Sequence, residues 1–243
     1  MSRPRTVTPE LPSETGVHDG LAYSLWLPAN SKGGVVVLHG AGSCKENHHD
    51  FARAALGADL AAIAFDQRGH GESEGRMDGR ALDDVARMAT LLRDRVGGDG
   101  PAAPIALRGS SMGGYLALVS AAAAHASAVV AICPASAEGL RRGLAEGRFS
   151  FQADEPALAA LLDAHDLRDA IASLEDVPVL LLHAEGDEQV PVEHSRELAA
   201  HMSAPNSRLV TVPGGHHRSI QHDDDLQALS LRFIGRALAT SGR

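Results

Sequence analysis

The sequence predicts an α/β protein with a doubly wound, mostly parallel sheet, and two patterns carry this prediction. Short runs rich in Val, Ile and Leu recur without the polar alternation of a half-exposed strand, which is typical of strands covered on both faces. Segments with helical periodicity separate these runs. A chain of 243 residues is long enough for one such domain with an inserted subdomain.

The apolar runs predict the strands in chain order. They cover residues 21–27, 33–40, 60–65, 104–108, 128–133, 177–183 and 207–212. Residues 1–16 are polar and contain prolines, which predicts a loose lead-in or an edge strand.

Helices are predicted between the strands at residues 48–56, 79–96, 112–125, 191–202 and 223–239. The second of these carries Leu82, Val85, Ala89 and Leu92 on one stripe, as an amphipathic helix does. The run of glycines and proline at residues 97–101 is expected to end it.

Residues 135–176 interrupt the alternation of strand and helix. They contain no buried strand pattern, and the acidic pair before Pro156 is a typical helix start. We therefore expect a single domain over residues 1–243, with an inserted helical cap at residues 135–176.

Composition narrows the function. The formal net charge of −9 argues against broad contact with nucleic acid or an anionic membrane. Two cysteines, Cys44 and Cys133, form no disulfide framework and are interpreted as free thiols. No apolar run approaches the length of a membrane span, and no apolar segment follows Met1–Arg5. The default expectation is a cytoplasmic protein.

The stretch around Ser111 holds the first candidate catalytic residue. Gly109-Ser110-Ser111-Met112-Gly113 lies between an apolar run and an Ala/Leu-rich helical run, so it predicts strand, sharp turn and helix. A G-x-S-x-G sequence in that context presents its serine as a nucleophile. The N–H of Met112, at the helix start, is a candidate oxyanion donor.

A second G-x-S-x-G occurs at Gly71–Gly75 around Ser73. The preceding strand ends several residues earlier, and no apolar helix follows directly. Glu72 and Glu74 flank this serine and would disfavour a developing negative charge. We interpret Ser73 as a loop residue.

Two later strand ends supply partners for Ser111. Asp187 follows Gly186 after the strand that ends at His183, and a histidine pair follows the last strand. The chain order Ser, Asp, His is the one used with this kind of nucleophile, in which His takes the serine proton and Asp orients the imidazole.

Competing residues stand beside each partner. Counting from Pro213 favours His217 over His216 as the base, and His216 is kept as the alternative. Glu185 and Glu188 compete with Asp187, but only Asp187 directly follows the turn glycine.

The first apolar strand ends in His39-Gly40-Ala41-Gly42, and the N–H of Ala41 is the predicted second oxyanion donor. We interpret His39 as a structural brace of that loop. The charged turn from Asp66 to Ser73 is interpreted as a rigid element held by an ion pair.

No metal and no cofactor are predicted. The histidine clusters lack the spacing of a zinc motif. A dinucleotide is not expected either, because no G-x-G-x-x-G follows the first strand.

Taken together, these pieces resemble the α/β-hydrolase superfamily, and they span residues 33–240 in the right order. The matching stretches are His39–Gly42, Asp66–Ser73, Gly109–Gly114, Gly186–Pro191 and Gly214–His217. The resemblance implies an eight-stranded sheet with the cap inserted after the sixth strand. The stretch Cys44–Phe51 is similar to small bacterial esterases of the cinnamoyl-ester and dienelactone-hydrolase-like groups. His216 departs from the pattern of many relatives, which carry a small residue or Asp there.

The leading expectation is a serine hydrolase that cleaves a small or medium carboxylic ester through Ser111, His217 and Asp187. A thioesterase or a peptidase or amidase with the same residues is an alternative. A non-catalytic ligand-binding or partner-binding protein is another, although such proteins usually lose a triad residue. The sequence does not indicate the oligomeric state.

Two features of the expected cap bear on the substrate. Phe149 and Phe151 suit either an apolar acyl pocket or ordinary packing. Arg141, Arg142 and Arg148 could meet an acidic substrate such as a CoA phosphate, but a solvated helix face is the preferred interpretation.

Overall fold

The computed structural model describes residues 9–98 and 102–241, and these form an eight-stranded sheet flanked by helices. The strands are β1 Glu14–His18, β2 Leu21–Trp26, β3 Gly34–Leu38, β4 Ala61–Phe65, β5 Ile105–Ser110, β6 Ala128–Ile132, β7 Val179–Ala184 and β8 Arg208–Val212. The helices are α1 His49–Leu56, α2 Ala81–Gly97, α3 Met112–Ser120, α4 Ala137–Ala145, α5 Glu155–Ala164, α6 Leu167–Ala172, α7 Val192–Ala199 and α8 Asp224–Ser241. Short 3-10 helices cover Lys45–His48 and Ile220–His222. The expectations for residues 1–8 and 99–101 lie outside the described residues.

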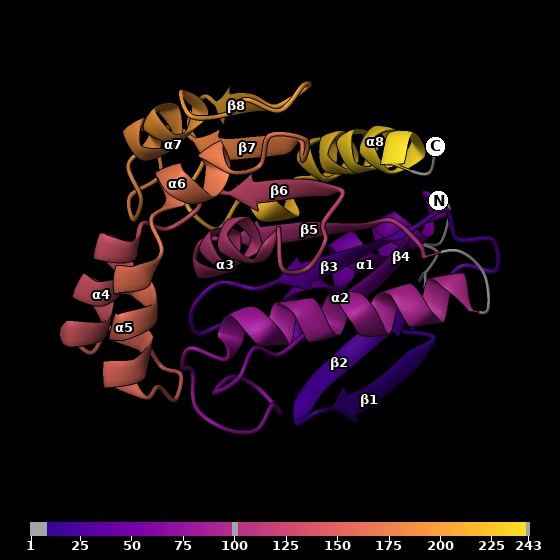
Figure 1. The fold of residues 1–243 in the computed structure, drawn as a ribbon, viewed down its shortest axis with the longest axis horizontal. Coiled ribbons are helices and arrows are strands. Elements are labelled where there is room, and N and C mark those ends of the chain that lie inside the picture. The colour runs from indigo at the N-terminus through magenta and orange to yellow at the C-terminus, as the bar shows by residue number, and fades with distance from the viewer. Residues whose placement is uncertain (1–8, 99–101, 242–243) are drawn as a thin grey trace, which may run out of the picture.

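The sheet confirms the predicted fold class. Its strand order is β1-β2-β4-β3-β5-β6-β7-β8, and β2 runs antiparallel to both of its neighbours while the other pairs are parallel (Figure 1). In register, Leu38 of β3 lies opposite Gly109 of β5, and Ser110 lies opposite Ile132 of β6. The carboxyl ends of the parallel strands therefore reach one edge of the sheet, where ligands of such sheets bind.

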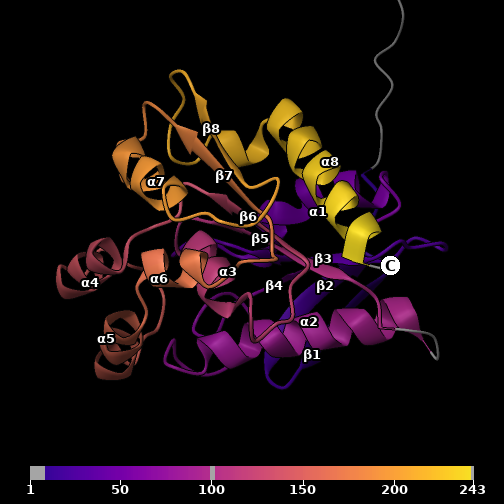
Figure 2. The ribbon, with the colours of Figure 1, turned by 45° about the horizontal axis from the view of Figure 1, so that its top comes forward.

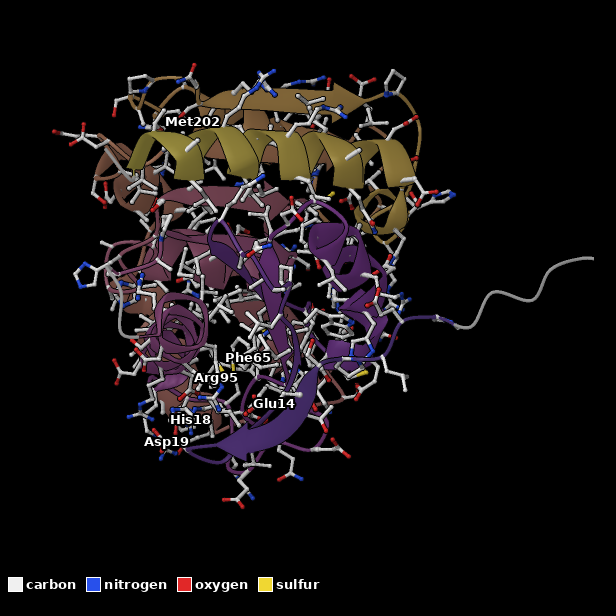
Figure 3. All side chains as sticks on the ribbon, turned by 90° about the vertical axis from the view of Figure 1, so that its right-hand side faces the viewer. Glu14, His18, Asp19, Phe65, Arg95 and Met202 are labelled. Carbon is white, nitrogen blue, oxygen red and sulfur yellow. The ribbon has the colours of Figure 1, made fainter. Side chains whose placement is uncertain are left out.

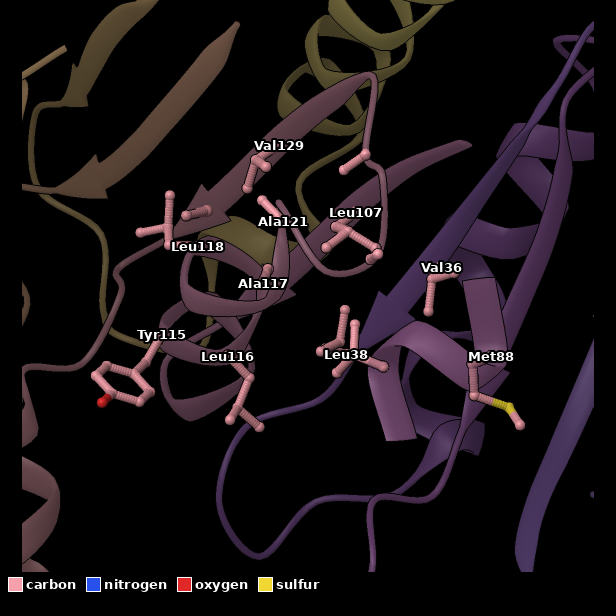
Figure 4. Packing of buried hydrophobic residues seen from close by; sticks show 14 of the residues in the cluster. Val36, Leu38, Met88, Leu107, Tyr115, Leu116, Ala117, Leu118, Ala121 and Val129 are labelled. Atoms are coloured by element: carbon pink, nitrogen blue, oxygen red, sulfur yellow. The ribbon is translucent and has the colours of Figure 1, made fainter. Parts of the chain in front are cut away.

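Helices cover both faces of the sheet, as the continuous apolar runs predicted. Figures 1 and 2 show α2 and α3 on one face and α1 and α8 on the other. Alternate residues of β3 divide between two apolar clusters. Val36 and Leu38 pack toward α2 and α3 (Figure 4). Val35 and Val37 pack toward α1 and α8. Each buried Val or Leu contributes roughly 1.5–3 kcal/mol through removal from water.

The edge strand β1 is tied to the rest of the fold by charged side chains. Glu14 of β1 forms an ion pair with Arg95 of α2 at 2.9 Å, and both lie on the face seen in Figure 3. Tyr23 of β2 donates a hydrogen bond to the same carboxylate. The predicted edge strand thus occupies residues 14–18, at the end of the lead-in.

Three helices, α4, α5 and α6, lie between β6 and β7 in the chain, within the interval predicted as a cap. Figure 1 places α4 and α5 beyond the carboxyl edge of the sheet. The helix start predicted at Pro156 is confirmed, because Asp154 Oδ1 accepts a hydrogen bond from Ala157 N at 3.2 Å. The chain before α5 is joined to the body of the protein by the hydrogen bond from Met77 N to Gln152 O at 2.8 Å.

The helix after Ser111 is shorter than predicted. It was expected to continue to about His125, but α3 ends at Ser120 and the chain turns through residues 121–125. The turn brings the chain back to start β6 at Ala128, and Arg93 of α2 donates hydrogen bonds to the carbonyls of Ala124 and His125. The alanine run therefore leaves the helix despite its helical preference, and the contact from Arg93 is consistent with tertiary packing at this turn.

Among the residues that the structure describes, no helix combines the length and apolar character needed to cross a membrane.

Candidate active site

Ser111 stands at the turn between β5 and α3 in a conformation that non-glycine residues rarely adopt. Its φ is 53° and its ψ is −118°, a strained backbone that costs of order 1–3 kcal/mol. Neighbouring backbone holds it there: Ser111 N donates to Ile132 O at 2.9 Å, and Ser111 O accepts from Ala135 N at 3.1 Å. The predicted strand–turn–helix around this serine is confirmed.

The two glycines of the G-x-S-x-G sequence permit this turn by close approach. A Cβ at Gly113 would lie 2.3 Å from Leu38 O, and one at Gly109 would lie 2.1 Å from Gly113 O. Both spacings are far below van der Waals contact, so larger residues would displace α3 from the sheet. The sharpness of the turn therefore depends on glycine at both positions.

Asp187 and His217 contact each other directly. His217 Nδ1–H donates to Asp187 Oδ2 at 2.7 Å, and the aspartate side chain is fully buried. The other carboxylate oxygen, Oδ1, accepts from the N–H groups of Gln189 at 2.8 Å and Val190 at 2.9 Å. With its Nδ1 proton committed to Asp187, the imidazole has Nε2 available to accept a proton.

The loops that carry these two residues are packed backbone to backbone. Gly186 N donates to Gly214 O at 3.1 Å, and a Cβ at Gly186 would lie 2.5 Å from Gly215 O. The glycine before Asp187 thus lets the loop after β7 approach the loop after β8. This approach sets the separation of Asp187 and His217.

The alternatives to these residues lie elsewhere. His216 is exposed, and its N–H donates to Ser219 Oγ at 2.8 Å. Glu185 and Glu188 are also exposed, and the contact of Glu188 is with the backbone N–H of His217, at 3.4 Å. The buried pair is therefore Asp187 with His217.

The side chain of His183 also contacts the Asp187 carboxylate, and this contact was not predicted from the sequence. Its ring is fully buried at the end of β7, and Nε2 lies 2.9 Å from Val190 O and 3.5 Å from Asp187 Oδ2. A carbonyl can only accept, so Nε2 carries the proton and Nδ1 accepts from Ser195 Oγ of α7 at 2.7 Å. This chain of contacts fixes the Asp187 loop to α7.

Hydrogen bonds lower the pKa of Asp187 more than burial raises it. Burial alone raises the pKa of Asp187, whereas the contacts from His183 and His217 hold that pKa well below its usual range. The carboxylate is therefore ionised at neutral pH.

Cys133 completes the surroundings of Asp187. Within the described residues, its thiol, the Asp187 carboxylate and the His217 ring place one possible metal-ligand atom each within 4.8 Å of one another. Burial raises the pKa of the Cys133 thiol, and a metal binds only the thiolate. This donor set suits a protonated thiol beside a hydrogen-bonded carboxylate and imidazole better than a metal. Cys133 and Cys44 are free cysteines, as predicted.

His39 braces the loop that carries Ala41, as the sequence analysis expected. Its Nδ1–H donates to Gly40 O at 2.8 Å, and its Nε2 accepts from Gln67 N at 3.0 Å. Burial lowers the pKa of His39 to about 4, so the ring is neutral and both nitrogens are used in these contacts. The oxyanion candidate Ala41 lies next to this anchor.

The charged turn that follows β4 is structural. Arg68 forms a bidentate ion pair with Asp84 of α2, at 2.5 and 2.6 Å, which confirms the predicted ion pair. Ser73, the serine of the second G-x-S-x-G, donates to Asp66 O at 2.5 Å and accepts from Ala22 N at 2.9 Å. These bonds pin the turn to β2.

An open cavity of about 730 Å³ lies over the carboxyl edge of the sheet. Ala41, Ser111 and His217 all line it. Met112, the other oxyanion candidate, is buried at the start of α3 and lines a smaller cavity with an apolar wall. Leu140 of α4 and Phe149 line both cavities and separate them.

Comparison with known proteins identifies the class. A family model described as serine aminopeptidase, S33, matches residues 29–148, and one described as TAP-like protein matches residues 163–233. An uncharacterized protein of Mycobacterium tuberculosis (strain ATCC 25618 / H37Rv) is 30% identical over 205 residues, which are 82% of this chain and 69% of that protein. Human monoglyceride lipase is 34% identical over 143 residues, 55% of this chain and 47% of that protein.

A solved structure agrees with this class. A soluble variant of monoglyceride lipase from Saccharomyces cerevisiae, in complex with a substrate analog, superposes with a TM-score of 0.72 at 18% identity, covering 98% of this chain and 97% of that chain. The chain belongs to the α/β-hydrolase superfamily. The comparisons further support its assignment as a carboxylic ester hydrolase.

Buried histidines near the site make the free energy of unfolding of the protein depend on pH. His48, which follows the Ala41 loop, is 2% exposed, and burial together with the nearby charge of Arg108 lowers its pKa to about 3. An unfolded histidine titrates near 6.5, so between pH 6.5 and 3 the unfolded chain binds more protons than the folded one. The free energy of unfolding should therefore fall as pH decreases through this interval, by up to about 1.4 kcal/mol per pH unit for each such group.

We predict that His48→Gln makes the free energy of unfolding less dependent on pH between pH 6 and 4. The decrease in slope should correspond to close to one bound proton. Urea unfolding at a series of pH values measures the slope. His201→Gln, at an exposed histidine, is the control and should keep the wild-type slope. An unchanged slope in His48→Gln would contradict the prediction.

Proposed function

We propose that the protein hydrolyses carboxylic esters through an acyl-enzyme, with Ser111 as nucleophile, His217 as general base and acid, and Asp187 as the group that orients His217. The observation that carries the proposal is the buried Asp187–His217 hydrogen bond at 2.7 Å, in a cavity that Ser111 also lines. The strained backbone of Ser111 supports the same role, since strain of this kind gathers at functional sites.

In this mechanism His217 Nε2 takes the proton of Ser111 as Oγ attacks the ester carbonyl. Asp187 stays ionised and stabilises the imidazolium that forms. The N–H groups of Ala41 and Met112 would donate to the oxyanion, and one such donor is worth about 10²–10³ in turnover. His217 then protonates the departing alcohol. Water, activated by the same ring, attacks the acyl-enzyme and releases the acid and free Ser111.

We propose that the acyl group lies against the apolar residues beside Ser111, between which the structure leaves a space of only about 10 Å³. The wall of this space includes Met112, next to Ser111, together with Leu140 and Phe149 of the inserted segment. We propose that residues 135–176 act as a cap in the single domain of residues 1–243, and that this cap limits the acyl group to small or medium length. The contacts of Phe149 support this role, because its ring packs against Gly143 of α4 and stacks on Phe151 with the ring centroids 5.3 Å apart.

Two other reactions use the same residues. Thioester cleavage and peptide or amide cleavage need the same nucleophile and base, and the family model described as serine aminopeptidase favours keeping the second of these as an alternative. The name monoglyceride lipase among the relatives favours the ester. A binding protein without catalysis would not need the strained backbone of Ser111.

Reaction with a fluorophosphonate probe tests the nucleophile. We expect stoichiometric labelling of the wild-type protein at Ser111, and loss of labelling in Ser111→Ala, because a fluorophosphonate traps only an activated serine. Peptide mapping by mass spectrometry locates the adduct. Ser73→Ala, which alters the second G-x-S-x-G, is the matched control and should still be labelled. Equal labelling of Ser111→Ala and wild type would rule out the assignment.

The acyl pocket predicts a change in chain-length preference. Phe149→Ala removes the ring that separates the two cavities, so we expect the ratio of kcat/KM for 4-nitrophenyl octanoate to that for the butyrate to rise roughly tenfold, well within the ~0.8 kcal/mol available per buried methylene. Leu144→Ala, on the same segment but lining neither cavity, should leave the ratio near wild type. The pocket assignment fails if the two variants give the same ratio.

A further inference from the structure

Three arginines from separate parts of the chain line the open cavity. Arg142 lies on α4, Arg148 in the loop after α4, and Arg218 directly after His217 in the loop that follows β8. All three line the cavity that Ser111 and His217 line. Their presence in one cavity depends on the fold, because α4 belongs to the inserted segment and Arg218 to the last third of the chain.

The charge of this cavity is opposite in sign to that of the protein. Its lining contains these three arginines and one acidic residue, Glu188, whereas the whole chain has a formal net charge of −9. A cleft of one sign attracts ligands of the other sign and orients them before contact. The cavity is therefore suited to a ligand with a negative charge.

The three arginines form at most weak ion pairs with other residues of the protein. Arg142 lies 4.0 Å from Glu138, and Arg148 pairs with Glu146; in both pairs the side chains are exposed. Exposed pairs of this kind contribute about 0–1 kcal/mol, so a ligand can compete for the guanidinium groups. Among the described residues, Arg218 has no carboxylate within ion-pair distance.

Arg141 shows the contrast. It neighbours Arg142 on α4 but does not line the cavity, and it forms an ion pair with Asp163 of α5. The solvated helix face that the sequence analysis preferred for Arg141, Arg142 and Arg148 therefore describes Arg141, while the other two arginines border the cavity.

We propose that the natural substrates are esters whose alcohol portion carries an anionic group, a phosphate or a carboxylate, bound by Arg142, Arg148 and Arg218. The inference rests on the proposed ester hydrolysis. The residues beside Met112 form an apolar wall suited to the acyl chain, whereas the three arginines line the open cavity above Ser111, where the proposal places the alcohol portion. The planar guanidinium group binds phosphate and carboxylate oxygens through paired hydrogen bonds.

Three matched butyryl esters test the proposal. They are the terminal monoesters of glycerol, of glycerol phosphate and of glycerate, which share the acyl group and differ in having a hydroxymethyl, a phosphate or a carboxylate at the far end. Butyrate release gives kcat/KM for each. We expect the anionic esters to exceed the neutral ester by roughly tenfold or more in the wild-type protein, and this ratio to fall as ionic strength rises.

Substitution of the arginines tests whether they cause the preference for anionic esters. Arg142→Gln, Arg148→Gln and Arg218→Gln should each lower the anionic-to-neutral ratio of kcat/KM, and the triple variant should bring it close to one. Arg141→Gln is the matched control and should keep the wild-type ratio. A preference for phosphate alone identifies a phosphate ester as the substrate class, and equal preference for both anions identifies the charge as the determinant.

Failure of this inference is distinct from failure of the proposed function. Hydrolysis of all three esters at similar kcat/KM, or an equal loss of ratio in Arg141→Gln and the triple variant, would overturn the role of the arginines and leave ester hydrolysis standing. If no ester is cleaved, calorimetric binding of the three esters to Ser111→Ala decides the role of the arginines without turnover. Tighter binding of the anionic esters that the triple substitution abolishes supports it, and equal binding of all three overturns it.

Discussion

The hydrogen bond between Asp187 and His217 is the interaction on which the candidate site depends. It joins two loops that follow different strands, so it requires β7 and β8 to be adjacent and parallel, with their carboxyl ends in register. The close approach of Gly186 to Gly215 O then brings the loops within reach of each other. Ser111 is placed independently, by the tight turn at the end of β5. The site is thus the meeting point of three strand ends that the sheet holds in a fixed arrangement.

Asp187 is surrounded by more hydrogen-bond donors than the contact with His217 alone supplies. Two backbone N–H groups, at Gln189 and Val190, saturate one oxygen, and His217 together with the neighbouring His183 faces the other. His183 is in turn held by Ser195 of α7. This arrangement keeps the carboxylate ionised despite its burial and fixes its orientation, which leaves the imidazole of His217 a single favourable position.

Local patterns predicted much of this structure, and long-range packing accounts for what they missed. The turn at Ser111 and the positions of Asp187 and His217 followed from residues that come directly after apolar runs. The end of α3 at Ser120 did not, and the turn that follows it is held by a long-range contact from Arg93 on another helix. The roles of His183 and of Arg218 also depend on which elements lie side by side. Spacing along the chain carries no signal for such contacts, and so the arginines could not be assigned to a cavity.

We propose that His217, held by Asp187, activates Ser111. The pre-steady-state acylation rate with a 4-nitrophenyl ester tests this, followed as the burst of nitrophenolate in His217→Ala and His216→Ala side by side. His217→Ala should slow acylation by several orders of magnitude, while His216→Ala, at an exposed histidine, should acylate at close to the wild-type rate. Rapid acylation of His217→Ala, or a comparable loss in His216→Ala, would contradict it.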